Sequence, residues 1–292
     1  SVSFAAVEES YADTRVLSEL VEDCIYLAST VKFGDGVGLC NDTEAPAALL
    51  AAANEAKAFI DASVSVVDLK AAIYKLKAAQ IAFLATIKDI ESDTKFYYIV
   101  NASEGEWAGM PMTTNLPTTS LTSGTFRVKC GVGDEDYSSY STHLYRFLAT
   151  YKGTYYVQNM ATGAYLPEFD TTDGVVNASF KPAEYYVEYA GNGAYIFTSA
   201  NALNSKSCPL GILKSDTISH MSEDNETILW SIVEPTEEVE AIVSTRIQYN
   251  SKGIVTFPFN LSSMDINEDF HIYGVRDMQQ TEGADGELET TI

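Results

Sequence analysis

The residues that most often perform catalysis are thinly spread in this chain of 292 residues. Its three histidines, His143, His220 and His271, lie far apart, and none belongs to an H-E-x-x-H motif or stands beside a cysteine. We expect each to be a surface or hydrogen-bonded structural histidine. No G-x-S-x-G elbow precedes a predicted helix, and no cysteine has the flanking sequence of a catalytic family. The sequence therefore predicts no enzyme and no catalytic residues, although a triad built from distant residues escapes this test.

Acidic residues often stand next to one another, as in Glu8–Glu9, Glu223–Asp224 and Glu268–Asp269. A glycosidase needs two carboxylates about 5 to 9.5 Å apart in a cleft. Among 41 acidic residues adjacent pairs arise by chance, so we interpret them as solvated turns. The segment GDEDYS around Asp134 lacks the alternating register and the distal glutamate of a calcium loop. We predict no metal site and no cofactor.

The side chains that do accumulate are those suited to sugar recognition, namely 18 tyrosines and 2 tryptophans with many Asn, Thr and Asp in predicted turns. Aromatic faces pack on the apolar faces of pyranose rings, and short amides and carboxylates bind the hydroxyls. Trp107 in SEGEW and Tyr165 in TGAYL are the candidate aromatic platforms. Asn101 and Asn159 occupy matching places in two similar segments, so we add them as candidate ligand-binding residues.

The charge balance excludes several classes of partner. Eighteen basic residues face 41 acidic ones, giving a net charge of -23, and the basic residues are scattered singly. Such a chain repels nucleic acid and anionic membrane surfaces. No apolar run approaches the roughly 18 to 20 residues of a membrane span, which predicts no membrane insertion. The start SVSFAAVEES lacks the features of a signal peptide, so we expect a soluble, already processed chain.

The four cysteines do not form a zinc motif, because no two stand at C-x2-C spacing. Cys24 and Cys40 lie 16 residues apart, and Cys130 and Cys208 lie 78 apart. Both pairs are compatible with disulfides in an oxidising compartment, and all four are equally compatible with buried free thiols. The sequence leaves this choice open.

The composition changes near residues 92–95, which predicts a boundary there. Before it the chain is rich in Ala, Leu, Lys and Glu, and the apolar residues recur every three or four positions, as in amphipathic helices. We predict helices from about Tyr11 to Val31, from Thr43 with Pro46 in its first turn, and from a Ser65 cap. The glycine-rich segment 34–38 has no strand before it and no Lys-Ser/Thr pair after it, so we interpret it as a connecting loop. Residues 1–94 are expected to form a three-helix bundle.

The region 95–235 contains an internal repeat. Segments that begin at Phe96, Thr154 and Gly193 each open with aromatic and β-branched residues and then change to turn residues. Each unit also closes on an aromatic residue, a spacer and an apolar residue, at Tyr145, Tyr185 and Trp230. Three units of roughly 40 to 55 residues cannot bury their apolar faces alone, so they predict a threefold closed β domain, a β-trefoil.

The opening and closing strands resemble those of the ricin-type β-trefoil family, whose repeats end in Gln-x-Trp. Only Trp230 keeps the tryptophan, and no closing strand has the glutamine. The phrase YYVQNMATGAYL is similar to strands of trefoil modules in secreted and surface proteins of anaerobic gut bacteria, and the helical segment resembles the bundles beside such modules. The resemblance implies an exported or cell-surface bacterial protein. β-trefoil interiors also use aromatic residues at these spacings, and we expect Tyr98, Tyr156, Tyr195 and Trp230 in the core.

Residues 236–292 follow an acidic linker, and Ile254–Phe259 and Phe270–Val275 read as strands. We expect a β-rich extension or an incomplete β module. The leading hypothesis is a noncatalytic, lectin-like carbohydrate-binding module of a secreted or cell-surface bacterial protein, with a glycan as its partner. The alternatives are an accessory or pro-segment region of a larger secreted hydrolase and a protein–protein interaction module. The sequence does not indicate which sugar is bound or the oligomeric state.

Overall fold

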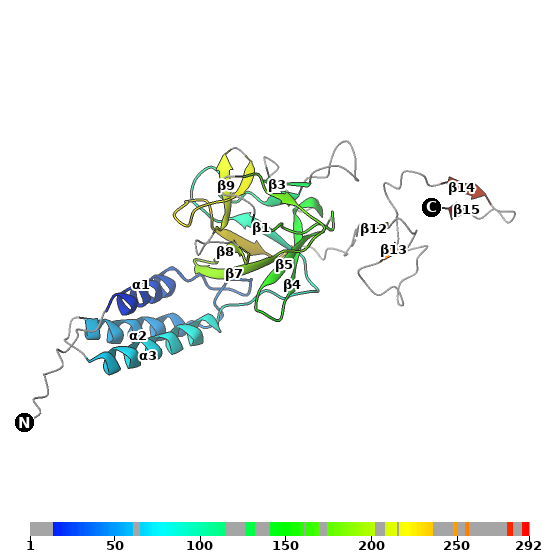
Figure 1. Cartoon of the computed structure of the whole chain (residues 1–292). Coiled ribbons are helices and arrows are strands. Elements are labelled where there is room, and N and C mark those ends of the chain that lie inside the picture. Colours follow the sequence, from blue (N-terminus) through cyan, green and yellow to red (C-terminus); the bar gives the residue numbers. More distant parts are fainter. Residues whose placement is uncertain are drawn as a thin grey trace, which may run out of the picture.

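The structure is a computed structural model, and it combines three α-helices with antiparallel β-sheets (Figure 1). It describes residues 14–60, 65–114, 126–131, 141–160, 162–169, 174–201, 208–214 and 216–235, and four short strands after them. The predicted order of helices first and strands second is confirmed. No helix in these described ranges is long and apolar enough to cross a membrane.

The three helices lie side by side at one side of the molecule (Figure 1). They are α1 (Arg15–Thr30), α2 (Ala45–Ile60) and α3 (Val66–Leu84). The Ser65 side chain accepts a hydrogen bond from the Asp68 backbone N–H at 3.2 Å, so the predicted helix cap is confirmed. Residues 11–13, where we expected the first helix to begin, lie outside the described residues.

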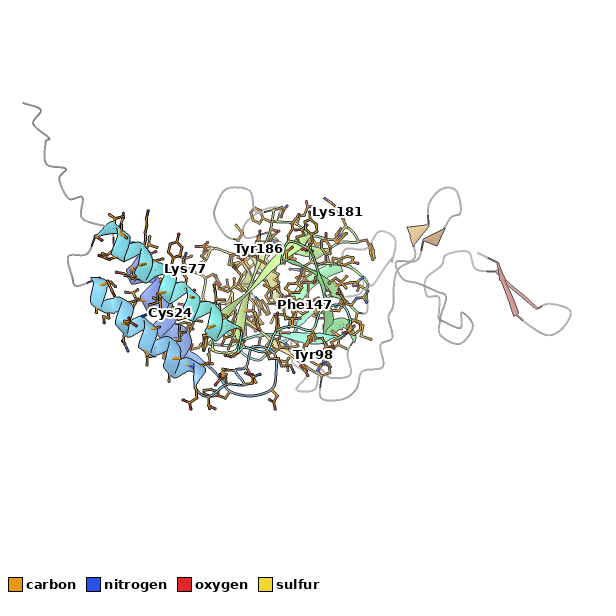
Figure 2. All side chains as sticks on the ribbon, turned by 90° about the horizontal axis from the view of Figure 1, so that it is seen from below. Cys24, Lys77, Tyr98, Phe147, Lys181 and Tyr186 are labelled. Atoms are coloured by element: carbon orange, nitrogen blue, oxygen red, sulfur yellow. The ribbon has the colours of Figure 1, made fainter. Side chains whose placement is uncertain are left out.

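The helices share a core of their own, built from the apolar stripes that the sequence predicts. Leu17, Leu49 and Leu76 are almost fully buried in it, and the Cys24 thiol lies between the helices (Figure 2). The third helix buries Ala72, which the sequence analysis missed, more deeply than Ile73. Small residues at such positions let helices approach closely.

Six antiparallel strands close a barrel in the order β1-β11-β8-β7-β5-β4. Aromatic and β-branched residues fill its interior; Phe147, for example, is fully buried there (Figure 2). The barrel strands are β1 (Tyr97–Asn101), β4 (Leu144–Ala149), β5 (Tyr155–Asn159), β7 (Glu184–Gly191), β8 (Ala194–Ser199) and β11 (Trp230–Val233).

A second sheet of five short strands packs against the same core. Its strand order is β2-β3-β10-β9, and β6 pairs with β3. Each repeat thus supplies two barrel strands with capping segments between them, which is the plan that the repeat predicts. The five strands are β2 (Met112–Thr114), β3 (Phe126–Cys130), β6 (Asn177–Ala178), β9 (Leu210–Lys214) and β10 (Thr217–His220).

The three closing aromatic residues occupy equivalent places in the barrel. Trp230 lies opposite Asn101, Tyr145 opposite Asn159, and Tyr185 opposite Ser199. All three aromatic side chains are buried, and each makes a hydrogen bond outside the barrel strands. The Trp230 Nε1–H donates to the Leu210 carbonyl at 2.8 Å, the Tyr145 hydroxyl bonds Thr114, and the Tyr185 hydroxyl donates to the Pro167 carbonyl. Threefold repetition therefore extends from the backbone to these polar contacts.

The helices dock on the barrel through glycine contacts. The predicted connecting loop 34–38 brings Gly38 against the turn at Gly193, between β7 and β8. Gly191 has a φ of +87°, and a Cβ there would lie 2.8 Å from the Tyr26 ring of α1. Tyr189 packs against both the helical core and the barrel core. These close approaches hold the two parts together.

The C-terminal strands form two hairpins, β12 (Gln248–Tyr249) with β13 (Val255–Thr256) and β14 (Gln279–Glu282) with β15 (Leu288–Thr291). The strand predicted at Ile254–Phe259 therefore appears in part, and the one at Phe270–Val275 lies outside the described residues. The last strand, β15, lies within the final residues of the chain. All four cysteines are buried free thiols, so the free-thiol interpretation holds and the bridged one does not.

Candidate ligand-binding surface

The two predicted asparagines lie at the ends of barrel strands and face inward. Asn101 is 1% exposed; its Nδ2 donates to the Thr227 carbonyl at 2.9 Å, and its Oδ1 accepts from the Ser103 backbone N–H. Asn159 is also 1% exposed; its Nδ2 donates to the Thr142 carbonyl at 2.7 Å. Both amides thus close turns inside the protein, and a surface ligand does not reach them in this conformation. Their ligand-binding role stays a prediction.

Trp107 lies in the connection between β1 and β2. Its side chain is half-buried and packs against the barrel core, and its carbonyl accepts a hydrogen bond from Met110. Part of the ring remains accessible for stacking. Trp107 is therefore neither a fully buried core residue nor a fully exposed aromatic platform.

Tyr165 is half-buried and follows β5, where its backbone pairs with Gln158 and with Ser179. Its ring meets the Tyr156 ring edge to face, with centroids 6.4 Å apart and planes at 79°. We expected Tyr156 in the core, but this is wrong, because Tyr156 is half-exposed and its neighbour Tyr155 packs against the core instead. Burial raises the pKa of the Tyr165 phenol, although Arg146 opposes the shift, so the hydroxyl is protonated near neutral pH.

Arg146 on β4 stands opposite Gln158 on β5. Its Nε–H donates to Gln158 Oε1 at 2.8 Å, and its guanidinium carbon lies 6.0 Å from the centre of the Phe96 ring. Gln158 Nε2 in turn donates to the Gly163 carbonyl, which fixes the amide. We call the set Phe96, Arg146, Tyr156, Gln158 and Tyr165 the barrel-side surface.

The other two repeats show what the fold itself requires at these positions. The pair Arg146–Gln158 is replaced by Ser231–Val100 and by Tyr186–Thr198 at the equivalent places of the barrel. Tyr165 forms an isolated β-bridge with Gln158, and the equivalent bridges in the other repeats join Val100 to Pro111 and Thr198 to Pro209. Pro111 and Pro209, not Trp107, are therefore the structural equivalents of Tyr165. The fold therefore does not need an arginine, a glutamine and a tyrosine here. The barrel-side surface is a local departure from the threefold pattern.

The buried histidine is structural. His220 on β10 is 3% exposed, its Nε2 lies 3.1 Å from the Tyr185 hydroxyl, and its ring meets Phe169 edge to face. Burial lowers the pKa of His220 to about 4. This confirms the structural interpretation for one of the three histidines. Within the described residues, no group of three His, Cys, Asp or Glu is arranged to hold a metal ion.

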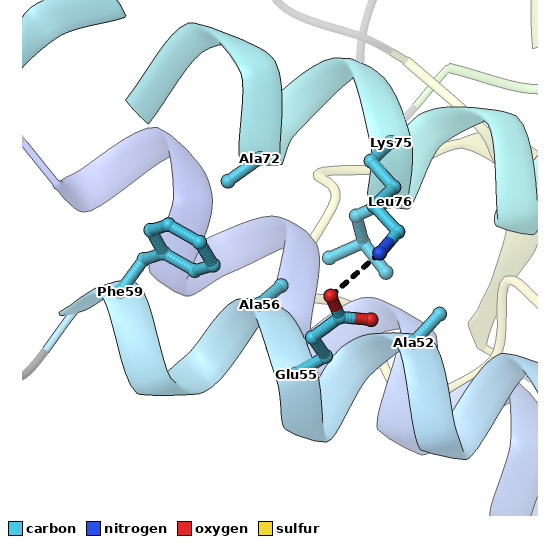
Figure 3. Close-up of a pocket in the computed structure, with 7 residues that line it drawn as sticks. All are labelled: Ala52, Glu55, Ala56, Phe59, Ala72, Lys75 and Leu76. Carbon is cyan, nitrogen blue, oxygen red and sulfur yellow. Dashed lines mark hydrogen bonds and ion pairs between the residues drawn. The ribbon is translucent and has the colours of Figure 1, made fainter. Parts of the chain in front are cut away.

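The helical part has a small pocket between α2 and α3 (Figure 3). The Lys75–Glu55 ion pair, 2.5 Å long, spans it, and both partners are more than half exposed. Alanines and the Phe59 ring make up most of the remaining wall. This apolar crevice has no set of converging polar groups with which to orient a ligand.

Comparison with known proteins found solved structures that are similar to about half of this chain. No family model and no curated protein matches the chain. A ricin B-like lectin of Macrolepiota procera, solved with lactose, is 15% identical; the match covers 51% of this chain and 100% of the lectin, with a TM-score of 0.38. The Rhizoctonia solani agglutinin is 15% identical over 50% of this chain and 99% of its own, with a TM-score of 0.37. A designed threefold symmetric protein, ThreeFoil, is 14% identical over 48% and 98%, with a TM-score of 0.37.

Of the five residues of the barrel-side surface, one was predicted from the sequence and four were not. Tyr165 was found because it follows a strand in a turn-like phrase. The sequence did contain a signal for Arg146 and Gln158. Each is a polar residue within a predicted strand and stands next to a buried aromatic or aliphatic residue. Arg146 and Gln158 meet only because β4 and β5 pair in one register, and the sequence of either strand alone does not determine that register.

Proposed function

We propose that the barrel and its capping sheet form a noncatalytic, lectin-like β-trefoil, and that the barrel-side surface binds a carbohydrate. The observation that carries the proposal is the departure from threefold repetition at this surface. Arg146 and Gln158 stand where the other repeats hold Ser231 and Val100 or Tyr186 and Thr198. Tyr165 stands where the other repeats hold Pro111 and Pro209.

The arrangement suits a pyranose ring. Tyr156 and Tyr165 meet nearly at a right angle, so a sugar packed on one ring face also meets the edge of the other. The phenol hydroxyls and the Arg146 N–H groups then lie at the margin of the ring, where sugar hydroxyls project. Gln158 holds the arginine in place, which reduces the entropy lost on binding.

Trp107 remains a second predicted platform. It belongs to another repeat, and its half-buried ring offers less free area than a fully exposed one. The two tryptophans of the chain allow the two platforms to be distinguished, because Trp230 is fully buried. Quenching or a shift of tryptophan emission by a bound sugar would come from Trp107.

A glycan array that includes lactose tests the proposal. We expect the intact chain to bind at least one class of glycan and Tyr165→Ala to lose at least tenfold in affinity. Tyr151→Ala is the matched control, because Tyr151 is 96% exposed at the β4–β5 turn and lies outside the barrel-side surface. Trp107→Ala tests the other platform. No binding by the intact chain ends the lectin proposal, and equal losses in the Tyr165 and Tyr151 variants move the site elsewhere.

We further propose that the protein acts outside a bacterial cell, secreted or on the surface, with the helices as a small bundle beside the β-trefoil. The resemblance of the phrase YYVQNMATGAYL supports this setting. Fractionation of the source cells, with antibody detection in the medium and on intact cells, tests it. Detection only in the cytoplasm contradicts it.

A further inference from the structure

Three lysines of the β domain have acidic partners, whereas Arg146 has none among the described residues. Lys129 pairs with Asp216, Lys152 with Glu184 at 2.9 Å, and Lys181 with Glu168 at 2.8 Å. Arg146 has no ion pair with any residue in the described part of the chain.

The neighbours of Arg146 orient its guanidinium and leave donors available. Gln158 accepts from Nε, and the Phe96 ring lies against the guanidinium. In the described ranges, neither Nη atom has a hydrogen-bond acceptor. An arginine guanidinium remains protonated, and its paired N–H groups match the two oxygens of a carboxylate or sulfate group. Among the described residues, the Arg146 charge therefore has no acidic partner and its Nη donors have no acceptor beside Tyr156 and Tyr165.

The fold itself does not require a charged group at this position. The equivalent positions of the other repeats hold Ser231 and Tyr186, which carry no charge, and the barrel closes in the same register there. Arg146 is half-buried, so it loses part of its hydration, and no ion pair with another described residue compensates for that loss. An anionic ligand would supply the missing partner.

We propose that Arg146 selects sugars that carry a negative group, a carboxylate or a sulfate, at the barrel-side surface. The proposal rests on the proposed carbohydrate-binding function. The sugar ring packs on Tyr156 or Tyr165, and its acidic substituent accepts two hydrogen bonds from the Nη atoms of Arg146. The charge on the substituent, not the identity of the ring, is the feature that Arg146 recognises.

Isothermal titration with matched sugars tests this selection. The probes are methyl β-D-galactoside, its C6-carboxylate form methyl β-D-galactosiduronate, and galactose 6-sulfate. We expect at least tenfold tighter binding of the uronate than of the neutral galactoside. If the sulfate binds as tightly as the uronate, charge is the determinant; if only the uronate binds tightly, the planar carboxylate is the determinant. Both results support the proposal.

Two substitutions separate this inference from the proposed function. Arg146→Gln should lose the preference for the uronate, so that its affinities for the uronate and for the neutral galactoside lie within about threefold of each other. Lys181→Gln, which removes the same charge elsewhere on the barrel, should keep that preference. Equal affinity of the intact chain for neutral and acidic sugars, or a preference that persists in Arg146→Gln, overturns the inference and leaves the lectin function standing. No binding of any of the three sugars overturns the inference, and no binding on the glycan array overturns the lectin function as well.

Discussion

The burial of His220 predicts how the stability of the folded protein changes in acid. The Tyr185 hydroxyl donates its proton to the Pro167 carbonyl, so the imidazole Nε2–H is the donor to the Tyr185 oxygen and the ring is neutral. Burial lowers the pKa of His220 to about 4, against about 6.5 in the unfolded chain. The unfolded chain therefore takes up this proton first as the pH falls, and the folded state loses stability between pH 6.5 and 4.

The size of the loss follows from the two pKa values. One pKa unit corresponds to about 1.4 kcal/mol, and the two states differ by roughly 2.5 units. Between pH 7.5 and 4.5 the His220 contribution to the free energy of unfolding should fall by about 2.5 kcal/mol. Above about pH 7.5 and below about pH 3 the contribution should be constant. The direction is opposite to that of a histidine stabilised by an acidic partner.

Urea unfolding followed by the emission of the buried Trp230 measures this loss, because Trp230 reports on the barrel. His220→Gln keeps a donor toward Tyr185 and removes the titration. Lysine partners lower the pKa values of Glu91 and Glu184, so protonation of these carboxylates also destabilises the protein in acid. This effect is the same in the intact protein and in His220→Gln. The difference between the two stability curves should therefore shrink by about 2.5 kcal/mol from pH 7.5 to 4.5. Parallel curves would refute the assignment.

Three further predictions concern the fold. Asn101→Ala and Asn159→Ala should each lower the free energy of unfolding by about 3 kcal/mol in chemical denaturation, because buried carbonyls lose their donors; a loss below 0.5 kcal/mol contradicts the turn-closing role. Trp230→Phe should cost about 2 kcal/mol in the same assay through the lost bond to a capping-sheet carbonyl and a small cavity, and unchanged stability argues against that bond. Gly191→Ala should lower the melting temperature more than Gly153→Ala, since both have positive φ but only the first Cβ would meet α1; equal losses would remove the proposed docking contact.

Much of the fold is encoded locally and was predicted from the sequence. The aromatic and β-branched residues in FYYIVN and TYYVQN identify β1 and β5, because such residues favour strands. The apolar stripe through Leu69, Leu76 and Phe83 identifies α3, and Ser65 marks its start. The closing aromatic residues were found because the same short pattern recurs three times.

The site was harder to predict because it depends on which face of each strand points inward. Tyr155 and Tyr156 are adjacent and identical, and only the register with β4 decides that Tyr156 points outward. Trp107 and Tyr165 appear equivalent in sequence, but Pro111 is the true counterpart of Tyr165, since the first repeat has a longer turn. Asn101 and Asn159 match in sequence because they perform the same structural task, and repetition alone does not separate such a task from binding.

The most direct test of the account is a crystal structure of the protein soaked with the tightest-binding glycan from the array. The account predicts a sugar ring packed within about 4 Å of Tyr156 or Tyr165, with an acidic group, where the glycan has one, in contact with Arg146. A sugar bound at Trp107 alone, at the α2–α3 pocket or at one of the other two repeats would contradict it.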